Sequence, residues 1–300
     1  MSLRRADGMA LAAMVGWGGA YVPSAWLIER WPLLVGAGAR FALGGLLLLS
    51  VLAIAGRPLR PRVGWGVVGW IALTQTVLFY AAVFWGIAHA GAGIAALLSN
   101  TDPLFIAVLA ALLLGERLSA RQWVGVVVGL VGAGVVVWEG PLWPVALSGD
   151  ALIVLAGAVV WSIGTVTVAR RVRGRADPLA LAAWQMLAGG VVLIGAGLVI
   201  EGAPAADGGA LALALLTAVL GAAMPLGLFY LALARAPAGE VSAWFFLVPV
   251  IGVLSAWVLL GETPGPGLLV GLTTICAGLW LVMARRVAAP GPLVESRPPP

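Results

Sequence analysis

Long apolar stretches dominate the sequence, and short polar or glycine- and proline-rich segments separate them. A helix that crosses a lipid bilayer needs about 20 mostly apolar residues. Ten stretches satisfy this requirement, and they cover residues 9–28, 33–55, 65–88, 91–115, 120–138, 150–169, 179–200, 209–234, 238–260 and 266–284. Only 10% of the residues are charged and 62% are hydrophobic, so a soluble fold would expose very large apolar patches. The sequence therefore predicts an all-α polytopic membrane protein with ten transmembrane helices, and it excludes a soluble enzyme.

The arginines are distributed unevenly among the segments that join these helices. With the N-terminus in the cytoplasm, fifteen of the seventeen basic residues fall in cytoplasmic segments, Arg30 alone lies in an outer loop, and Arg40 lies within a helix. Basic residues concentrate on the cytoplasmic side of membrane proteins. Both termini are therefore predicted to be cytoplasmic, in the cytoplasmic (inner) membrane, and the use of arginine without lysine indicates a bacterial composition bias. The net charge of +5 then reflects orientation, and no nucleic-acid partner is expected.

The two halves of the sequence resemble each other. Residues 88–136 align with 234–282 without gaps, and 14 of the 49 positions are identical. The least common matches in an apolar chain are Pro103 with Pro249 and Gly115-Glu116 with Gly261-Glu262. Each repeat would hold five helices, an odd number, so the second copy would be inserted upside down, as in many secondary transporters.

This alignment divides the chain into four parts. Residues 1–8 form a cytoplasmic tail, 9–139 the first five-helix repeat, 140–287 the second, inverted repeat, and 288–300 a disordered cytoplasmic tail. At an offset of 144 residues, Trp17 also aligns with Trp161, and Arg40 aligns with Trp184.

Together these features resemble the drug/metabolite transporter superfamily and its EamA-type branch. The resemblance rests on ten helices in a five-plus-five repeat, on Trp17-Gly18, on Arg40-Phe41, and on the stretch from proline to Gly-Glu in both fourth helices. It implies an exporter of small metabolites, amino acids or drugs that acts without a cofactor and is driven by protons or another gradient.

Two charged residues are predicted to lie within the membrane, where charges are costly and mark functional sites. Asp102 lies about 16 Å and Arg40 about 10 Å along their helices from the outer side, at 1.5 Å per residue. Asp102 either exchanges a proton for substrate, binds a cationic group, or forms a static ion pair with Arg40. The family usually has an uncharged polar residue near Asp102, which favours a role specific to a subtype. Arg40 either binds a substrate carboxylate or anchors helix packing through backbone carbonyls.

Polar and aromatic residues away from the helix ends are candidates for a substrate cavity, because such side chains bind amphipathic solutes. The alternative for each is simple packing. The candidates besides Arg40 are Trp17, Tyr21, Gln75, Tyr80, Asn100, Trp161, Trp184, Gln185, Tyr230 and Trp244.

Prolines and glycines within the helices predict where the bundle bends and packs. Pro103, Pro225 and Pro249 are candidate hinges or static kinks, because proline removes a backbone hydrogen bond. Small residues one turn apart allow close helix contact. Such pairs occur in the fifth and tenth helices, which are predicted either to pack together or to form a homodimer; the pairs are Gly125 with Gly129 and Gly267 with Gly271.

The favoured function is a proton-coupled exporter of small metabolites, amino acids or drugs that works by alternating access. An uncoupled exchanger of organic solutes is the alternative, and a non-transport membrane protein fits less well. The sequence contains no G-x-S-x-G, H-E-x-x-H or Walker A motif, which argues against an enzyme or a self-contained ATP-driven pump. A single cysteine, Cys276, and a single histidine, His89, give no metal cluster. The expected partners are a small-molecule substrate and the lipid bilayer.

Overall fold

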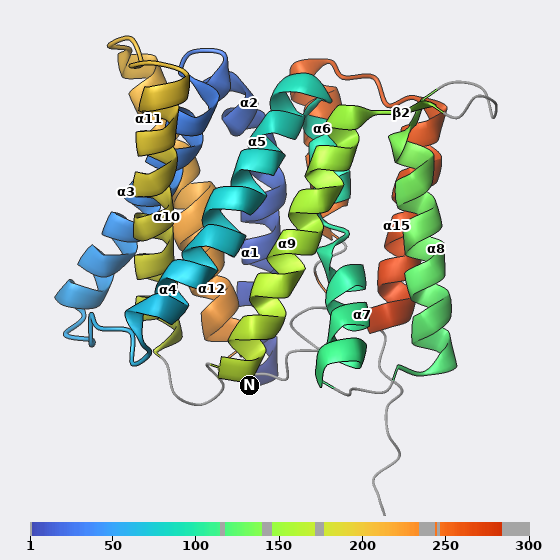
Figure 1. Ribbon diagram of the computed structural model, residues 1–300, viewed down its shortest axis with the longest axis horizontal. Coiled ribbons are helices and arrows are strands. Elements are labelled where there is room, and N and C mark those ends of the chain that lie inside the picture. The colour runs from blue at the N-terminus through green and yellow to red at the C-terminus, as the bar shows by residue number, and fades with distance from the viewer. Residues whose placement is uncertain are drawn as a thin grey trace, which may run out of the picture.

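The structure is a computed structural model that describes residues 2–114, 118–139, 146–171, 177–233, 244 and 247–283. Almost all of these residues are helical, and the helices run side by side in one bundle (Figure 1). Seven helical segments are long and apolar enough to cross a membrane, and three further apolar helices are shorter. The prediction of an all-helical, polytopic membrane protein is confirmed at this level.

The chain up to residue 139 supplies the first group of helices. They are α1 (Ser2–Gly19), α2 (Tyr21–Ile28), α3 (Leu33–Ile54), α4 (Trp65–Ile71), the π-helix η1 (Ala72–Leu78), α5 (Phe79–His89), α6 (Ala92–Ser99), α7 (Asp102–Leu114) and α8 (Ala120–Val137). A two-stranded antiparallel hairpin follows, formed by β1 (Trp138–Glu139) and β2 (Ala146–Leu147).

The second group begins after this hairpin. It consists of α9 (Gly149–Arg171), α10 (Pro178–Ile200), α11 (Gly208–Ala218), the π-helix η2 (Val219–Ala223), α12 (Met224–Leu233), α14 (Leu247–Ser255), the π-helix η4 (Ala256–Leu260) and α15 (Pro266–Met283).

The predicted fourth span, 91–115, is not one continuous helix. It consists of α6 and α7, which are separated at Asn100 and Thr101. Proline at position 103 has no N–H, so the hydrogen-bond ladder of α6 cannot continue through it. Side chains at the break replace the missing backbone donors. Asn100 Nδ2 donates to the carbonyl of Ala96 at 2.8 Å, and Thr101 Oγ1 donates to the carbonyl of Leu98 at 2.7 Å. The break therefore costs little, because local side chains satisfy the carbonyls that it frees.

Other predicted spans are also interrupted. The first span bends at Ala20 between α1 and α2, and π-helices interrupt the third, eighth and ninth spans as η1, η2 and η4. Wide turns of this kind are rare in proteins and concentrate at functional sites. The prolines at positions 103, 225 and 249 predict hinges or kinks in the fourth, eighth and ninth spans, but no sequence feature predicts the π-helices.

The glycines predicted to mediate helix packing lie largely in one contact within the chain. The helices α8 and α15 pack along each other (Figure 1). A Cβ on Gly125 would lie 2.8 Å from the carbonyl oxygen of Gly278, and one on Gly271 would lie 3.1 Å from that of Gly132. Gly129 faces Gly278 in the same contact, whereas Gly267 approaches only the carbonyl of Val135, at 3.8 Å. The fifth and tenth helices thus pack together, and these glycines give no support to the predicted homodimer.

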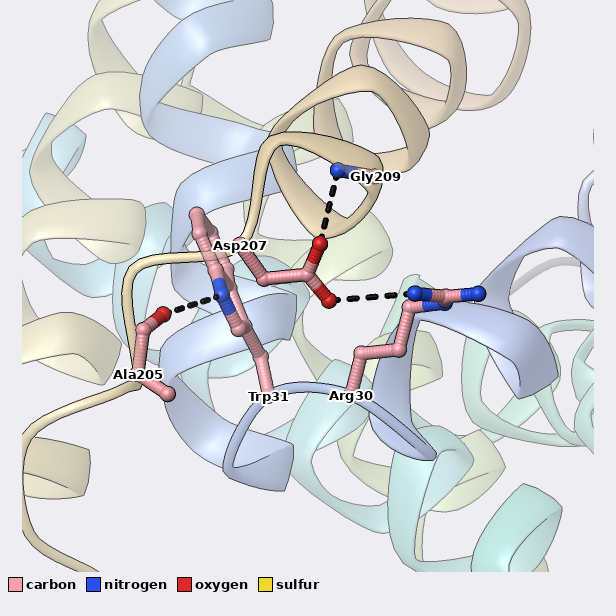
Figure 2. Close-up of polar contacts among 5 residues, drawn as sticks. All are labelled: Arg30, Trp31, Ala205, Asp207 and Gly209. Carbon is pink, nitrogen blue, oxygen red and sulfur yellow. Dashed lines mark hydrogen bonds and ion pairs between the residues drawn. The ribbon is translucent and has the colours of Figure 1, made fainter.

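The two loops at one end of the bundle are joined by polar contacts, which Figure 2 shows. Arg30 Nη1 donates to Asp207 Oδ2 at 3.1 Å, and Trp31 Nε1 donates to the carbonyl of Ala205 at 3.2 Å. Asp207 Oδ1 also accepts the N–H of Gly209 at 2.7 Å at the start of α11. The hydrogen bond from Arg30 holds the pKa of Asp207 below its usual range. Arg30, the single arginine that the sequence places in an outer loop, therefore joins this loop to the loop that contains Asp207.

A glutamate from the second half of the chain caps a helix of the first half. Glu262 accepts the N–H of Ala92 with Oε1 and the N–H of Gly93 with Oε2, both at 2.9 Å. Gly91, which precedes α6, has a φ of 94° and would place a Cβ 3.2 Å from the Glu262 carboxylate. The carboxylate satisfies two free N–H groups and lies at the positive end of the helix dipole.

We expect Glu262→Ala to lower the free energy of unfolding by about 1–2 kcal/mol, because two capping hydrogen bonds are lost. Thermal unfolding of the detergent-solubilised protein measures this loss. Glu29→Ala is the matched control, since Glu29 is exposed and its side chain makes no hydrogen bond in the described structure. Equal melting temperatures for the two variants would contradict the capping role.

Candidate functional site

A central cavity with a volume of about 50 Å³ lies between the two groups of helices. Elements from α1 to α14 contribute its wall. The lining residues are Trp17, Tyr21, Arg40, Phe79, Tyr80, Val83, Ile87, Asn100, Asp102, Trp161 and Val248. Seven of these residues are site candidates from the sequence. The mainly apolar wall with a few polar groups is typical of small-molecule sites.

Asp102 lies at the point where the fourth span is interrupted. It is the first residue of α7, and it is 5% exposed. The hydroxyl of Ser162 in α9 donates to its backbone carbonyl at 3.0 Å. In the described part of the chain, no side chain donates a hydrogen bond to the carboxylate of Asp102. The sequence placed Asp102 inside a continuous helix; instead, the helix begins there, and the carboxylate borders the cavity.

Arg40 is held by hydrogen bonds and aromatic rings. Its Nη1 donates to Ser24 Oγ at 3.0 Å, and its Nη2 donates to the carbonyl of Gly221 in η2 at 2.6 Å. The Cζ of Arg40 lies 5.1 Å, 5.5 Å and 5.8 Å from the ring centroids of Phe41, Tyr80 and Phe84. Arg40 therefore ties α3 to α2 and to η2, 181 residues away along the chain.

An ion pair between Arg40 and Asp102 is absent. The ion pairs found among the described residues are Arg30–Asp207 and Arg57–Asp177, both near helix ends. The static pair considered from the sequence is therefore not present in this conformation. The carboxylate of Asp102 stays available on the cavity wall, because the Arg40 guanidinium is occupied elsewhere.

Aromatic rings form much of the cavity wall. Phe79 lies 4.8 Å from Tyr80 and 4.7 Å from Trp161, measured between ring centroids, and Tyr80 lies 6.1 Å from Trp161. The Tyr21 hydroxyl is 2.6 Å from Ser99 Oγ and accepts from Asn100 Nδ2 at 3.1 Å. A wall of this kind binds apolar bodies and, through the ring faces, cations.

A second, smaller cavity of about 10 Å³ adjoins the first. Trp17, Tyr80 and Trp161 line both cavities. We call the first the outer cavity and the second the inner cavity. The inner cavity is further lined by Phe41, Gln75, Thr76, Gln185, Met186, Ala222 and Leu226. Gln75 Nε2 donates to Thr165 Oγ1 at 2.8 Å, whereas Gln185 Oε1 is buried without a partner.

Two of the sequence candidates, Trp184 and Trp244, line neither cavity. Trp184 packs edge-on against Trp65 at 5.2 Å, and its Nε1 donates to the carbonyl of Leu59 at 2.7 Å. Trp244 packs in the apolar clusters around Ala10 and Val248. The side chain of Tyr230 lies outside the described residues.

The candidate hinge prolines lie close to breaks or changes of helix type. Pro103 is the second residue of α7 and Pro225 the second residue of α12, directly after η2. Pro249 is the third residue of α14. Pro103 lies in a first turn, where the missing N–H costs least, whereas Pro225 lies within the continuous run of α11, η2 and α12. The π-helix η1 contains no proline, so proline is not what widens that helix.

Four lining residues of the outer cavity were not predicted: Phe79, Val83, Ile87 and Val248. For Phe79, Val83 and Ile87, nothing in the sequence separates a cavity-lining residue from a packing residue. Val248 could have been predicted, because it occupies the position of Asp102 in the internal alignment. Trp17 and Trp161, which also align with each other, likewise line the same cavity. Within the described residues, no group of three His, Cys, Asp or Glu side chains is arranged to hold a metal ion.

Comparison with known proteins bears on this architecture. The model of the EamA-like transporter family matches residues 4–138 and again residues 148–284. A probable amino-acid metabolite efflux pump of Salmonella typhimurium is 28% identical over 93% of this chain and 95% of its own length. A probable terminal-alkyne amino-acid exporter of Streptantibioticus cattleyicolor is 32% identical over 82% of this chain and 84% of its own.

A solved crystal structure has the same fold. It superposes with a TM-score of 0.67 at 19% sequence identity, and the match covers 92% of this chain and 95% of the other. The helical bundle, its central cavity and the two matches to one family model describe a membrane transporter and not an enzyme. The chain belongs to the EamA-like transporter family.

Proposed function

We propose that this protein is a secondary active exporter that moves small amino-acid-like organic solutes out of the cell by alternating access. The observation that carries the proposal is the outer cavity. Residues at equivalent positions of the two sequence halves line it together: Trp17 with Trp161, and Asp102 with Val248. Two related halves around one central site can exchange conformations and expose the site to each side in turn.

The proposal includes ten transmembrane helices, arranged as inverted repeats 9–139 and 140–287. The two ranges matched by the family model support this division. In Figure 1 the beginning of α1, the end of α3, the beginning of α8 and the end of α15 lie at the lower end of the bundle. Arg57, Arg60 and Arg62 follow the end of α3, and Arg121 lies at the beginning of α8, whereas Arg30 follows the end of α2. A cytoplasmic location of both termini, in the inner membrane, follows from the positive-inside rule.

Unequal cavities support a conformational cycle. The outer cavity has a volume of about 50 Å³ and the inner one about 10 Å³. A drug-sized ligand needs roughly 300–1,000 Å³, so the central site would have to widen to hold such a solute, as a conformational cycle requires. Pro103 follows the break between α6 and α7, Pro225 directly follows η2, and Pro249 lies in the first turn of α14; these places would act as hinges.

Proton coupling is assigned to Asp102. The carboxylate lies at the outer cavity and is not paired with Arg40, so it can bind a proton or a cationic group of the substrate. Competition between the two would exchange one for the other. An uncoupled exchanger of organic solutes is the second candidate; it is favoured if Asp102 only binds the cationic group.

Proteoliposomes with an imposed pH gradient test the proposal. We expect gradient-dependent accumulation of at least one compound from a panel of amino acids and cationic drugs, and no accumulation in protein-free liposomes. Flux that persists without the gradient would indicate the uncoupled exchanger. The exporter function would be wrong if no compound class moved in either condition.

A further inference from the structure

The pair Gly261-Glu262 is one of the distinctive matches between the two sequence halves, yet it lines neither the outer nor the inner cavity. Gly261 follows η4 with a φ of 72°, a left-handed conformation that glycine adopts without strain. The N–H of Glu262 donates to the carbonyl of Ala256 at 3.3 Å, so the chain turns back here. The turn brings the Glu262 carboxylate to the N–H groups of Ala92 and Gly93. Glu262 therefore joins η4 of the second half to α6 of the first.

An apolar cluster connects this contact to the outer cavity. We call it the outer seal, and it consists of the buried residues Phe79, Val83, Ile87, Ala92, Ala95 and Ala256. Phe79, Val83 and Ile87 also line the outer cavity. Ala92 and Ala95 belong to α6, and Ala256 belongs to η4. The two elements that Glu262 joins therefore supply half of the outer seal.

The contact lies at the outer end of the bundle in the proposed orientation. Helix α15 begins shortly after Glu262, and α3 begins shortly after Arg30. Both helices begin at the upper end of the bundle in Figure 1, because their ends lie at the lower one. Glu262 and the outer seal thus lie between the outer cavity and the side on which the solute is released.

Helix α6 links Glu262 to the wall of the outer cavity. Seven of its eight residues are buried. At its far end the Tyr21 hydroxyl is 2.6 Å from Ser99 Oγ and accepts from Asn100 Nδ2 at 3.1 Å. Asp102 follows the break that ends α6. Because α6 is short and buried, a shift at its start also displaces Asn100 and Asp102 in the cavity wall.

The hydrogen bonds of Glu262 are a major part of what holds η4 on α6. The members of the outer seal that these two elements supply are all alanines, whose small side chains make few dispersion contacts. Hydrogen bonds to a carboxylate are stronger than those between neutral groups. An open cavity of about 400 Å³ lies beside Glu262 and is also lined by Gly91 and Gly265. The carboxylate therefore has space to leave α6 without displacing a packed side chain.

We propose that Glu262 is a positioning residue that holds the outer end of the transport path closed. While its carboxylate caps α6, the outer seal separates the outer cavity from the outside. When the carboxylate leaves, α6 and η4 separate and the cavity opens outward. The contact is made only in the closed conformation, so it sets the balance between the closed and open conformations. This inference rests on the proposed alternating access and orientation.

The accessibility of a single cysteine tests the inference without a known substrate. Val83→Cys in a Cys276→Ala background places the one thiol of the chain in the outer seal. Val83 is 2% exposed, so the thiol reacts only when the cavity opens. The reagent is 2-(trimethylammonium)ethyl methanethiosulfonate, which is small and does not cross membranes. It is applied to intact cells for the outer side and to inverted membrane vesicles for the cytoplasmic side.

We expect Glu262→Ala to raise the labelling rate from the outside about tenfold, the value of about 1.4 kcal/mol of capping energy. The rate from the cytoplasmic side should not rise. Glu262→Gln keeps one carbonyl acceptor, so its outside rate should rise by less, about threefold. An unchanged outside rate, or equal acceleration from both sides, would overturn the inference. If Glu262→Ala does not fold, Glu262→Gln decides the question by the same criteria.

Glu201→Ala is the matched control. Glu201 also comes from the second half and caps a helix of the first, since its Oε2 accepts the N–H of Leu34 at 2.9 Å. It joins α3 and α10, whose backbones pack closely: a Cβ on Gly45 would lie 2.7 Å from the carbonyl oxygen of Ala183. This contact does not belong to the outer seal, so we expect the parent labelling rate. Acceleration equal to that of Glu262→Ala would assign the effect to any lost cap and overturn the inference.

The outcomes separate this inference from the proposed function. If no compound of the transport panel moves, the transport function itself fails, whatever the labelling rates are. If compounds move but both Glu262 variants are labelled at the parent rate, only the role of Glu262 fails.

Discussion

Asp102→Asn is expected to abolish the accumulation of substrate that a pH gradient drives. Asparagine has nearly the same shape as aspartate but does not release or bind a proton in this range. One pH unit corresponds to about 1.4 kcal/mol per proton, or about tenfold accumulation in a one-to-one exchange. The variant should lose this factor in proteoliposomes that carry a one-unit gradient.

A matched control separates this effect from a general loss of carboxylate charge. Asp150, in the first turn of α9, accepts a hydrogen bond from Trp85 at 2.8 Å and lies outside both cavities. We expect Asp150→Asn to retain gradient-driven accumulation. If Asp102→Asn accumulated substrate as well as the wild type, Asp102 would not be the proton site.

Gly278→Leu is expected to destabilise the fold more than any other substitution considered above. A Cβ at this position would lie 2.5 Å from the backbone nitrogen of Gly129 and 2.6 Å from the carbonyl oxygen of Gly125. These neighbours are backbone atoms and have no side-chain freedom to move away. Helices α8 and α15 would have to separate, at a cost of about 3 kcal/mol or more. Thermal unfolding in detergent should show a decrease in melting temperature of roughly 5 °C or more.

The control for this prediction lies in the same helix pair. A Cβ on Gly134 of α8 would meet no atom within 4 Å, so Gly134→Leu should unfold at or above the wild-type temperature. Both variants add the same side chain to a helix of the same contact, and only the space available differs. A wild-type melting temperature for Gly278→Leu would show that the α8–α15 contact is not closely packed.

The sequence predicted the apolar helices because hydropathy is a local property. About 20 apolar residues in a row require a membrane, whatever their neighbours are. Pro103 predicted a hinge or kink in the fourth span, but the π-helices were not predicted, because hydropathy does not show how the backbone hydrogen bonds are arranged. At positions 100 and 101, side-chain hydrogen bonds to Ala96 and Leu98 replace the helical ladder. In η1 the backbone widens without proline, a change that packing against α9 and α10 accompanies.

Aromatic candidates were predicted less reliably than charged ones. Trp17 and Trp161 line the cavity, whereas Trp184 hydrogen-bonds a loop carbonyl at the end of its helix. Tryptophan suits both a cavity wall and the membrane interface, so its type alone does not decide between them. Asp102 was found because a charge within an apolar stretch has few structural explanations.

The sequence by itself determined that this chain forms a helical membrane bundle, that its halves are related, and that Asp102 and Arg40 are its exceptional residues. These conclusions need only the type and order of residues along the chain. Only the tertiary structure decided that the two charges do not pair, because Arg40 reaches Ser24 and the carbonyl of Gly221. It also decided that Gln185 keeps an acceptor without a donor. The physical reason is that hydrogen-bond partners are set by distance in space, and residues 181 positions apart become neighbours only when the helices pack.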